Sequence, residues 1–193
     1  MDYKKKRLSK DNVAEYIGKS SADAFAGKTV PGVPALLQKD FGQRNNCTIC
    51  SITALLCFYT KKEPRTIYDL VVMKAGRLFF RPQHRGTNPF AIRWIMFRCT
   101  RALRVKKSSR AGYLKGIGFG FNKVKTLIKR GAPMILSFHH DGNRYYRSHS
   151  VTVVGYAECG GKKLLEILDN WNDTPSYIDY DRLSVFSSIN YLQ

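Results

Sequence analysis

The sequence predicts an α+β protein, with helices in the first part of the chain and antiparallel strands in the last part. Up to residue 130 the apolar residues recur at helical spacing, whereas from residue 131 onward they follow the two-residue period of strands. Turn-forming residues at 141–143 and 160–161 separate these strands. The length of 193 residues suits one domain or two closely packed lobes.

The helical part is expected to follow an arm and connector over residues 1–34, where Asp11 caps a predicted short helix. Residues 47–59 are apolar on nearly every side, so the helix that Asn46 caps there is expected to lie centrally. Further helices are predicted over residues 66–79, 89–100 and 121–129.

The strand part contains predicted strands at residues 133–138, 149–156, 163–169, 177–180 and 188–192. Helices before strands, with one clear change of period between them, favour two lobes that pack on each other. We therefore expect one domain over residues 35–193. Its helical lobe spans about 35–130 and its antiparallel β lobe about 131–193.

Basic side chains are concentrated in the middle of the chain. The formal net charge is +19, and residues 61–130 alone hold 19 basic and 2 acidic side chains, a net charge of +17. Unpaired charges are not buried, so the helical lobe is expected to present a broad positive surface. We expect polyanion contact, with nucleic acid or an anionic envelope polymer, through residues 98–110. The alternative is a solvated face that only aids solubility. The densest basic residues are Arg98, Arg101, Arg104, Lys106, Lys107 and Arg110.

The five cysteines favour free thiols over a disulfide framework, because three of them fall on one predicted helix. They are Cys47, Cys50, Cys57, Cys99 and Cys159. No apolar run is long enough to span a bilayer. The basic N-terminus lacks the apolar core of a signal peptide. A cytoplasmic location is the default expectation, and export after removal of a signal is the alternative.

Cys47 is the cysteine that the pattern places at the start of a helix. Unpaired backbone N–H groups at such a position favour the thiolate, which is the nucleophilic form. A catalytic thiolate also needs an imidazole partner and a side chain that orients the imidazole.

Three segments supply these parts in one order along the chain. They are Gln43-Arg44-Asn45-Asn46-Cys47, Ser148-His149-Ser150-Val151-Thr152-Val153-Val154-Gly155-Tyr156 and Leu168-Asp169-Asn170-Trp171. Together they resemble the C39-like branch of the papain-like cysteine peptidases, a bacterial group. The resemblance covers roughly residues 35–185. It implies a papain-like fold with an active-site cleft between the helical and β lobes.

The resemblance also implies a role for each residue. Cys47 is the expected nucleophile, His149 the general base and acid, and Asp169 the residue that orients His149. Gln43 is the expected oxyanion donor, although it precedes the cysteine by four residues where the family commonly has six. Cys50 remains the alternative nucleophile. Asn170 is the alternative to Asp169, since neighbouring strand residues point to opposite faces.

The function predicted from these residues is hydrolysis of a peptide or amide bond through a thioester acyl-enzyme. Acyl transfer to an amine on the same fold is one alternative. A catalytically dead scaffold that binds a polyanion is the other. We expect no cofactor and no metal, because the Cys47 and Cys50 pair lacks two further ligands for structural zinc. The sequence leaves the oligomeric state open.

Overall fold

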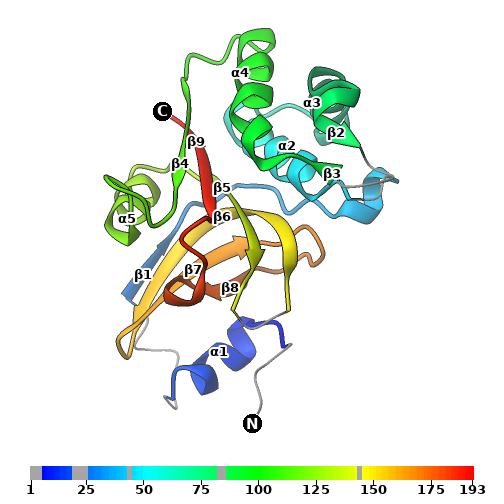
Figure 1. Ribbon diagram of the computed structural model, residues 1–193. Helices are drawn as coiled ribbons and strands as arrows, with labels where there is room; N and C mark the ends of the chain where they lie inside the picture. Colours follow the sequence, from blue (N-terminus) through cyan, green and yellow to red (C-terminus); the bar gives the residue numbers. More distant parts are fainter. Residues whose placement is uncertain (1–5, 19–25, 43–44, 82–85, 143–144) are drawn as a thin grey trace.

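The computed structural model describes residues 6–18, 26–42, 45–81, 86–142 and 145–193, and it confirms the predicted α+β class. A group of three helices packs at one end of a seven-stranded sheet (Figure 1). These helices are α2 (Cys47–Thr60), α3 (Pro64–Phe79) and α4 (Ile92–Ala102). The strands of the sheet are β1 (Ala26–Thr29), β4 (Ser109–Tyr113), β5 (Met134–His140), β6 (Arg147–Cys159), β7 (Lys162–Leu168), β8 (Ser176–Asp179) and β9 (Ser188–Leu192).

Every pairing in this sheet is antiparallel, and the strand order is β4-β9-β5-β6-β7-β8. The long strand β6 also pairs with β1, which continues along β6 where β5 stops. Gly155 lies at this junction, and a Cβ there would come within 2.8 Å of the Lys28 carbonyl oxygen. The close approach of β1 therefore requires glycine at position 155.

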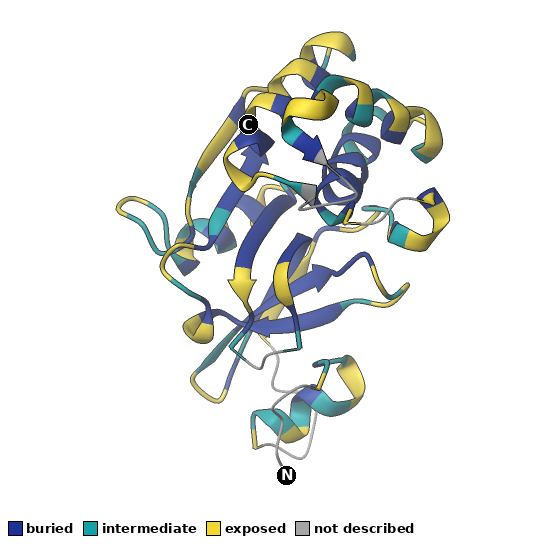
Figure 2. Ribbon diagram, turned by 45° about the vertical axis from the view of Figure 1, so that its right-hand side comes forward, coloured by how far each residue is buried: buried dark blue, intermediate teal, exposed yellow. Residues whose placement is uncertain are grey.

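Helix α2 is central, as its all-round apolar sequence predicts. Every residue from Thr48 to Cys57 is buried, and the helix contacts α3, α4, β5 and β6. Figure 2 shows the outer faces of the neighbouring helices exposed while the middle strands of the sheet are buried. The helix ends at Lys61, which adopts the left-handed conformation with φ 55°.

The sheet includes two segments that the sequence predicts to lie outside the β lobe. Strand β1 comes from the expected N-terminal connector, and β4 comes from the expected helical lobe. Helix α5 (Phe121–Lys129) also packs against the β core, where Val124 and Ile128 are fully buried. Strands β1 and β4 are short and lack a complete alternating pattern, so their pairing depends on tertiary contacts.

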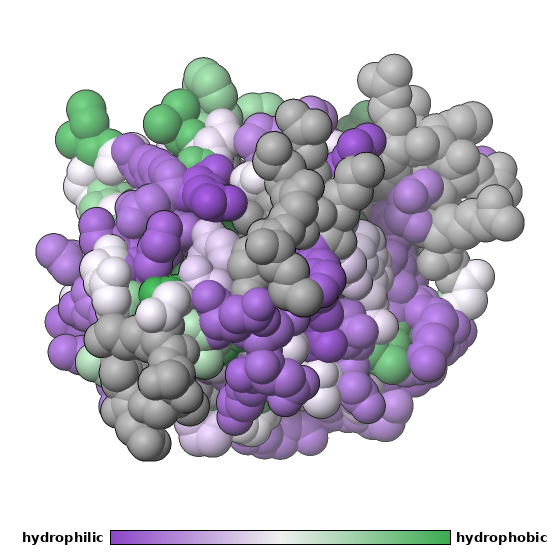
Figure 3. All heavy atoms as spheres, turned by 90° about the horizontal axis from the view of Figure 1, so that it is seen from below, coloured by the Kyte–Doolittle hydropathy of each residue, from purple (hydrophilic) through white to green (hydrophobic). Residues whose placement is uncertain are grey.

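The N-terminal segment docks at β8, at the opposite end of the molecule from α2 (Figure 1). Helix α1 (Lys10–Tyr16) starts with a capping box formed by Ser9 and Asn12, so Ser9 and not Asp11 is its N-cap residue. Leu8 bridges to Tyr177 and packs in a small apolar cluster with β6, β7 and β8. Figure 3 shows the molecule from this N-terminal side, where the visible face is largely hydrophilic.

Short elements complete the described chain. They are η2 (Gln38–Phe41), β2 (Phe80–Arg81), β3 (Gly86–Thr87), η3 (Pro89–Ala91) and η4 (Tyr180–Arg182). Among the described helices, none combines the length and the apolar character needed to cross a bilayer.

Candidate active site

Cys47 is the first residue of α2, and this helix packs against β6, which carries His149. Burial alone raises the pKa of the Cys47 thiol. Hydrogen bonding to His149 and the charge of that ring outweigh burial, and the backbone amides of Ser150 and Thr48 add to the effect. The pKa of Cys47 therefore lies below its usual value. A lowered pKa increases the fraction of thiolate, the reactive form.

The His149 ring is held by the main chain that follows β7. Its Nε2 lies 2.7 Å from the carbonyl oxygen of Asp169. Because a carbonyl oxygen can only accept, Nε2 carries the proton in this bond, and Nδ1 is the ring nitrogen left for the Cys47 thiol. The contact thus runs through the backbone of Asp169. The part that the Asp169 carboxylate plays in catalysis stays a prediction.

The Asp169 carboxylate is fully buried and accepts hydrogen bonds from several donors. Oδ1 accepts from the amides of Trp171 and Asn172, at 2.9 and 2.8 Å. Oδ2 accepts from the Tyr146 hydroxyl at 2.7 Å and from the side chains of Asn172 and Ser176. Burial raises the pKa of this carboxyl, but these bonds, led by that of Tyr146, bring the pKa below its usual value. The carboxylate thereby fixes the loop that presents the Asp169 carbonyl to His149.

Two aromatic rings enclose the imidazole. Tyr146 stacks on His149 with an interplanar angle of 4° and a centroid distance of 5.5 Å. Trp171 lies on the ring at 4.3 Å, tilted by 37°. The two rings therefore hold the imidazole in place and shield it from solvent.

Asn170 adopts the left-handed conformation with φ 62°, and its side chain points to the start of α2. Its Nδ2 donates to the carbonyl oxygens of Cys47 at 3.2 Å and Ser150 at 3.1 Å, and to the Ser51 hydroxyl at 2.9 Å. The residue therefore ties the helix that carries the thiol to the strand that carries the imidazole. In the described structure the hydrogen bonds from this side chain go to these three acceptors and not to His149.

A pocket of about 380 Å³ opens beside Cys47 and His149. Hydroxyl groups form part of its floor, where Ser150 Oγ lies 2.8 Å from Thr48 Oγ1 and 2.7 Å from Ser137 Oγ. Apart from histidine, no charged side chain lines it among the described residues. Aromatic rings form another part of its wall: Phe90, Tyr113, Phe138 and Phe186.

The other predicted site residues lie elsewhere. Cys50 is fully buried in the helical core, and burial together with the nearby Cys47 raises the pKa of its thiol. This environment disfavours Cys50 as a nucleophile. Gln43 lies outside the described residues, so the predicted oxyanion donor stays a prediction.

A comparison of the sequence with protein-family models matches residues 30–193 to the Peptidase_C39 like family. The chain belongs to the Peptidase_C39 like family. The match covers most of the chain, and the α+β architecture agrees with the papain-like peptidase fold that the sequence resemblance implies. No curated protein matched the chain.

Two features of this C39-like site escaped the sequence analysis. Tyr146 contacts both His149 and the Asp169 carboxylate, but the segment before β6 shows no pattern that singles it out. The aromatic pocket wall combines residues from η3, β4, β5 and the segment before β9. Only the tertiary fold brings these distant positions together.

The bridge made by Asn170 leads to a stability prediction for this C39-like chain. Asn170→Gly keeps the left-handed backbone accessible but removes the three donated bonds. We expect the free energy of unfolding to fall by about 1–3 kcal/mol, because buried carbonyl oxygens lose their donor. Denaturant unfolding measures this, with Asn122→Gly at an exposed position as the control for added glycine. An equal loss in both variants would show that the bridge contributes nothing.

Proposed function

We propose that the protein is a cysteine peptidase in which Cys47 is the nucleophile and His149 the general acid and base. The observation that carries this proposal is the thiol of Cys47 at a helix start, hydrogen-bonded to a buried imidazole beside an open pocket. Membership of a peptidase-like family supports it. A dead binding scaffold has no need for a thiol whose pKa is lowered.

In the proposed first step, the Cys47 thiolate attacks the carbonyl carbon of a peptide bond, and the carbonyl oxygen becomes an oxyanion. The backbone amide of Cys47 has no partner within α2, because it lies at the helix start, and in this proposal it stabilises the charge. Collapse of the intermediate breaks the C–N bond. His149 gives its Nδ1 proton to the leaving amine, which leaves a thioester on Cys47 and a neutral imidazole.

In the second step the neutral His149 takes a proton from water, which attacks the thioester carbon. Release of the carboxylic acid regenerates the thiolate and the imidazolium. Water reaches this centre because the pocket is open to solvent. Transfer to an amine follows the same steps with an amine in place of water, and the products distinguish the two reactions.

The pocket wall favours a substrate with a bulky apolar side chain next to the cleaved bond. Phe90 and Phe186 are 77% and 80% exposed, so both gain from covering by an apolar group. The described pocket lining offers no carboxylate to a basic substrate residue and no lysine or arginine to an acidic one.

A diverse peptide library provides the test. We expect the wild-type protein to cleave preferentially beside bulky apolar residues, as read by mass spectrometry of the products. Cys47→Ser should reduce turnover by several orders of magnitude, because a hydroxyl is a far weaker nucleophile here. Cys50→Ser, one helical turn away, is the matched control and should remain active. Cleavage that survives Cys47→Ser would refute the proposal.

A further inference from the structure

The outward face of α4 combines aromatic rings with arginines. Trp94 and Phe97 are 52% and 45% exposed, and their rings stack at 5.5 Å. Arg93, Arg98 and Arg101 are exposed on the same helix, and helical spacing puts all five side chains on the side opposite its buried residues. Large exposed apolar groups that cluster on one face mark an interaction surface.

A basic pocket adjoins the C-terminal end of this helix. It measures about 380 Å³ and is lined by Lys62, Arg104, Lys106 and Lys107 together with Tyr59. Within the described part of the chain the Tyr59 hydroxyl is buried and has no hydrogen-bond partner, and the Lys107 ammonium lies 5.1 Å from the centroid of the Tyr59 ring. Burial raises the pKa of Tyr59 to about 12, so the hydroxyl keeps its proton at neutral pH. The four cations around this pocket suit a phosphate group.

Within the described part of the chain, no carboxylate forms an ion pair with these cations. The ion pairs found among the described residues include none of the arginines on the α4 face and none of the cations of the basic pocket. The ends of α2 and α4 lie here, and their carbonyl groups offset part of the charge. Two helix ends supply only about one elementary charge. The remaining positive charge is available to an external anion.

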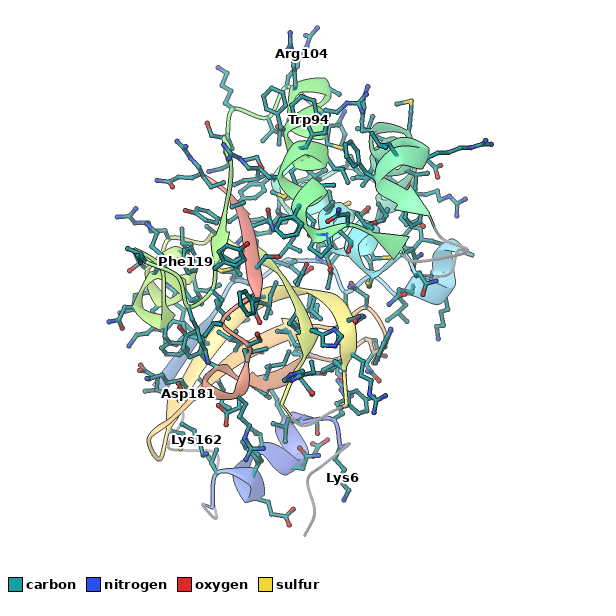
Figure 4. All side chains as sticks on the ribbon, in the orientation of Figure 1. Lys6, Trp94, Arg104, Phe119, Lys162 and Asp181 are labelled. Carbon is teal, nitrogen blue, oxygen red and sulfur yellow. The ribbon has the colours of Figure 1, made fainter. Side chains whose placement is uncertain are left out.

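We infer that this surface docks the protein on an anionic phospholipid bilayer. Lipid phosphates occupy the basic pocket, the arginines of α4 contact neighbouring headgroups, and Trp94 and Phe97 enter the interfacial region. A lipid surface fits better than nucleic acid, because the two rings stack on each other and neither presents two free faces to bases. Figure 4 shows Trp94 and Arg104 at the α4 end of the molecule, away from Lys6 in the N-terminal segment.

The position of this surface bears on the candidate active site. Helix α4 begins directly after η3, where Phe90 lines the pocket beside Cys47. Docking through α4 therefore holds the pocket close to the bilayer, where peptides with apolar segments accumulate.

Vesicle sedimentation tests the inference, with phosphatidylcholine vesicles compared with vesicles that contain phosphatidylglycerol. We expect binding to the anionic vesicles only, weakening steeply as salt rises. The triple variant Arg98→Gln, Arg101→Gln, Arg104→Gln should bind about a hundredfold more weakly, at about tenfold or less per charge. The variant Lys123→Gln, Lys129→Gln, Arg130→Gln removes the same charge from α5 and its C-cap residue, and should bind nearly as the wild type does. Equal weakening of both variants would overturn the inference.

Tryptophan fluorescence gives an independent measurement in the folded protein. The chain has two tryptophans, so Trp171→Phe leaves Trp94 as the reporter. We expect the emission of Trp94 to shift to the blue on binding and to be quenched by brominated acyl chains. Unchanged emission on bound vesicles, or binding to a DNA oligonucleotide without binding to anionic vesicles, would each contradict membrane docking.

Discussion

Replacing His149 with alanine is expected to slow alkylation of Cys47 by at least about tenfold at mildly acidic pH. The hydrogen bond and charge of His149 are what bring the pKa of Cys47 down, against the effect of burial. Without the imidazole, burial remains and raises that pKa, so the thiolate fraction falls. One unit of pKa changes the thiolate fraction tenfold below both pKa values. Mass spectrometry after timed iodoacetamide treatment measures the rate at each cysteine.

The other cysteines provide internal controls for this experiment. Burial raises the pKa of Cys57 to about 11 and that of Cys99 to about 12. In the folded wild-type protein both should react far more slowly than Cys47. Labelling of the buried cysteines at the rate of Cys47, or a rate at Cys47 that His149→Ala leaves unchanged, would contradict the thiolate–imidazolium pair.

Asp169→Ala is expected to lower the free energy of unfolding by about 3 kcal/mol or more. Removal of the carboxylate leaves the donors of Tyr146, Ser176 and the following loop amides without an acceptor. Each buried group left unpaired costs about 1–3 kcal/mol of stability. Urea unfolding measures the change. Asp173→Ala, at an exposed position in the same loop, is the control and should alter stability little. Similar losses in the two variants would show that the hydrogen-bonded network is not the cause.

Asp169 also gives stability a dependence on pH. Its pKa in the folded protein lies below its ordinary value of 3.8, so the unfolded chain binds more protons between the two pKa values. The stabilisation is therefore fully present above about pH 4 and is lost as pH falls through the folded pKa. Asp169→Asn should flatten this acid limb of the stability curve. If the stability of Asp169→Asn fell with acid as steeply as that of the wild type, Asp169 would not be the group responsible for this pH dependence.

The sequence predicted those parts of the fold that have a strong local pattern. The all-round apolar stretch from Cys47 to Tyr59 gave α2 and its central position, and the alternation around His149 gave β6. Segments whose place depends on distant partners were harder to predict. Strand β1 has four exposed residues and no apolar alternation, so only its pairing with β6 defines it.

In the candidate site, too, features with a local sequence pattern could be predicted, and features that depend on the tertiary fold could not. The helix position of Cys47 and the order of residues along the chain were enough to predict that Cys47 and His149 form a pair. The structure has them in contact. The link between His149 and Asp169 could not be predicted, because it uses a backbone carbonyl that any residue carries. The sequence suggests Asn170 only as an alternative partner of His149. Its left-handed backbone turns the side chain to α2 instead.

The position of β9 between β4 and β5 has a consequence for how the protein folds. Ser109 pairs with Leu192, so the sheet joins segments more than eighty residues apart in the sequence. Such long-range pairing raises the contact order, and high contact order slows folding. During synthesis, the edges of β4 and β5 that pair with β9 stay unpaired until residues 188–192 have left the ribosome. Exposed strand edges can pair with strands of other chains. Newly made chains thus pass through a period of vulnerability to aggregation that ends only when this strand is inserted.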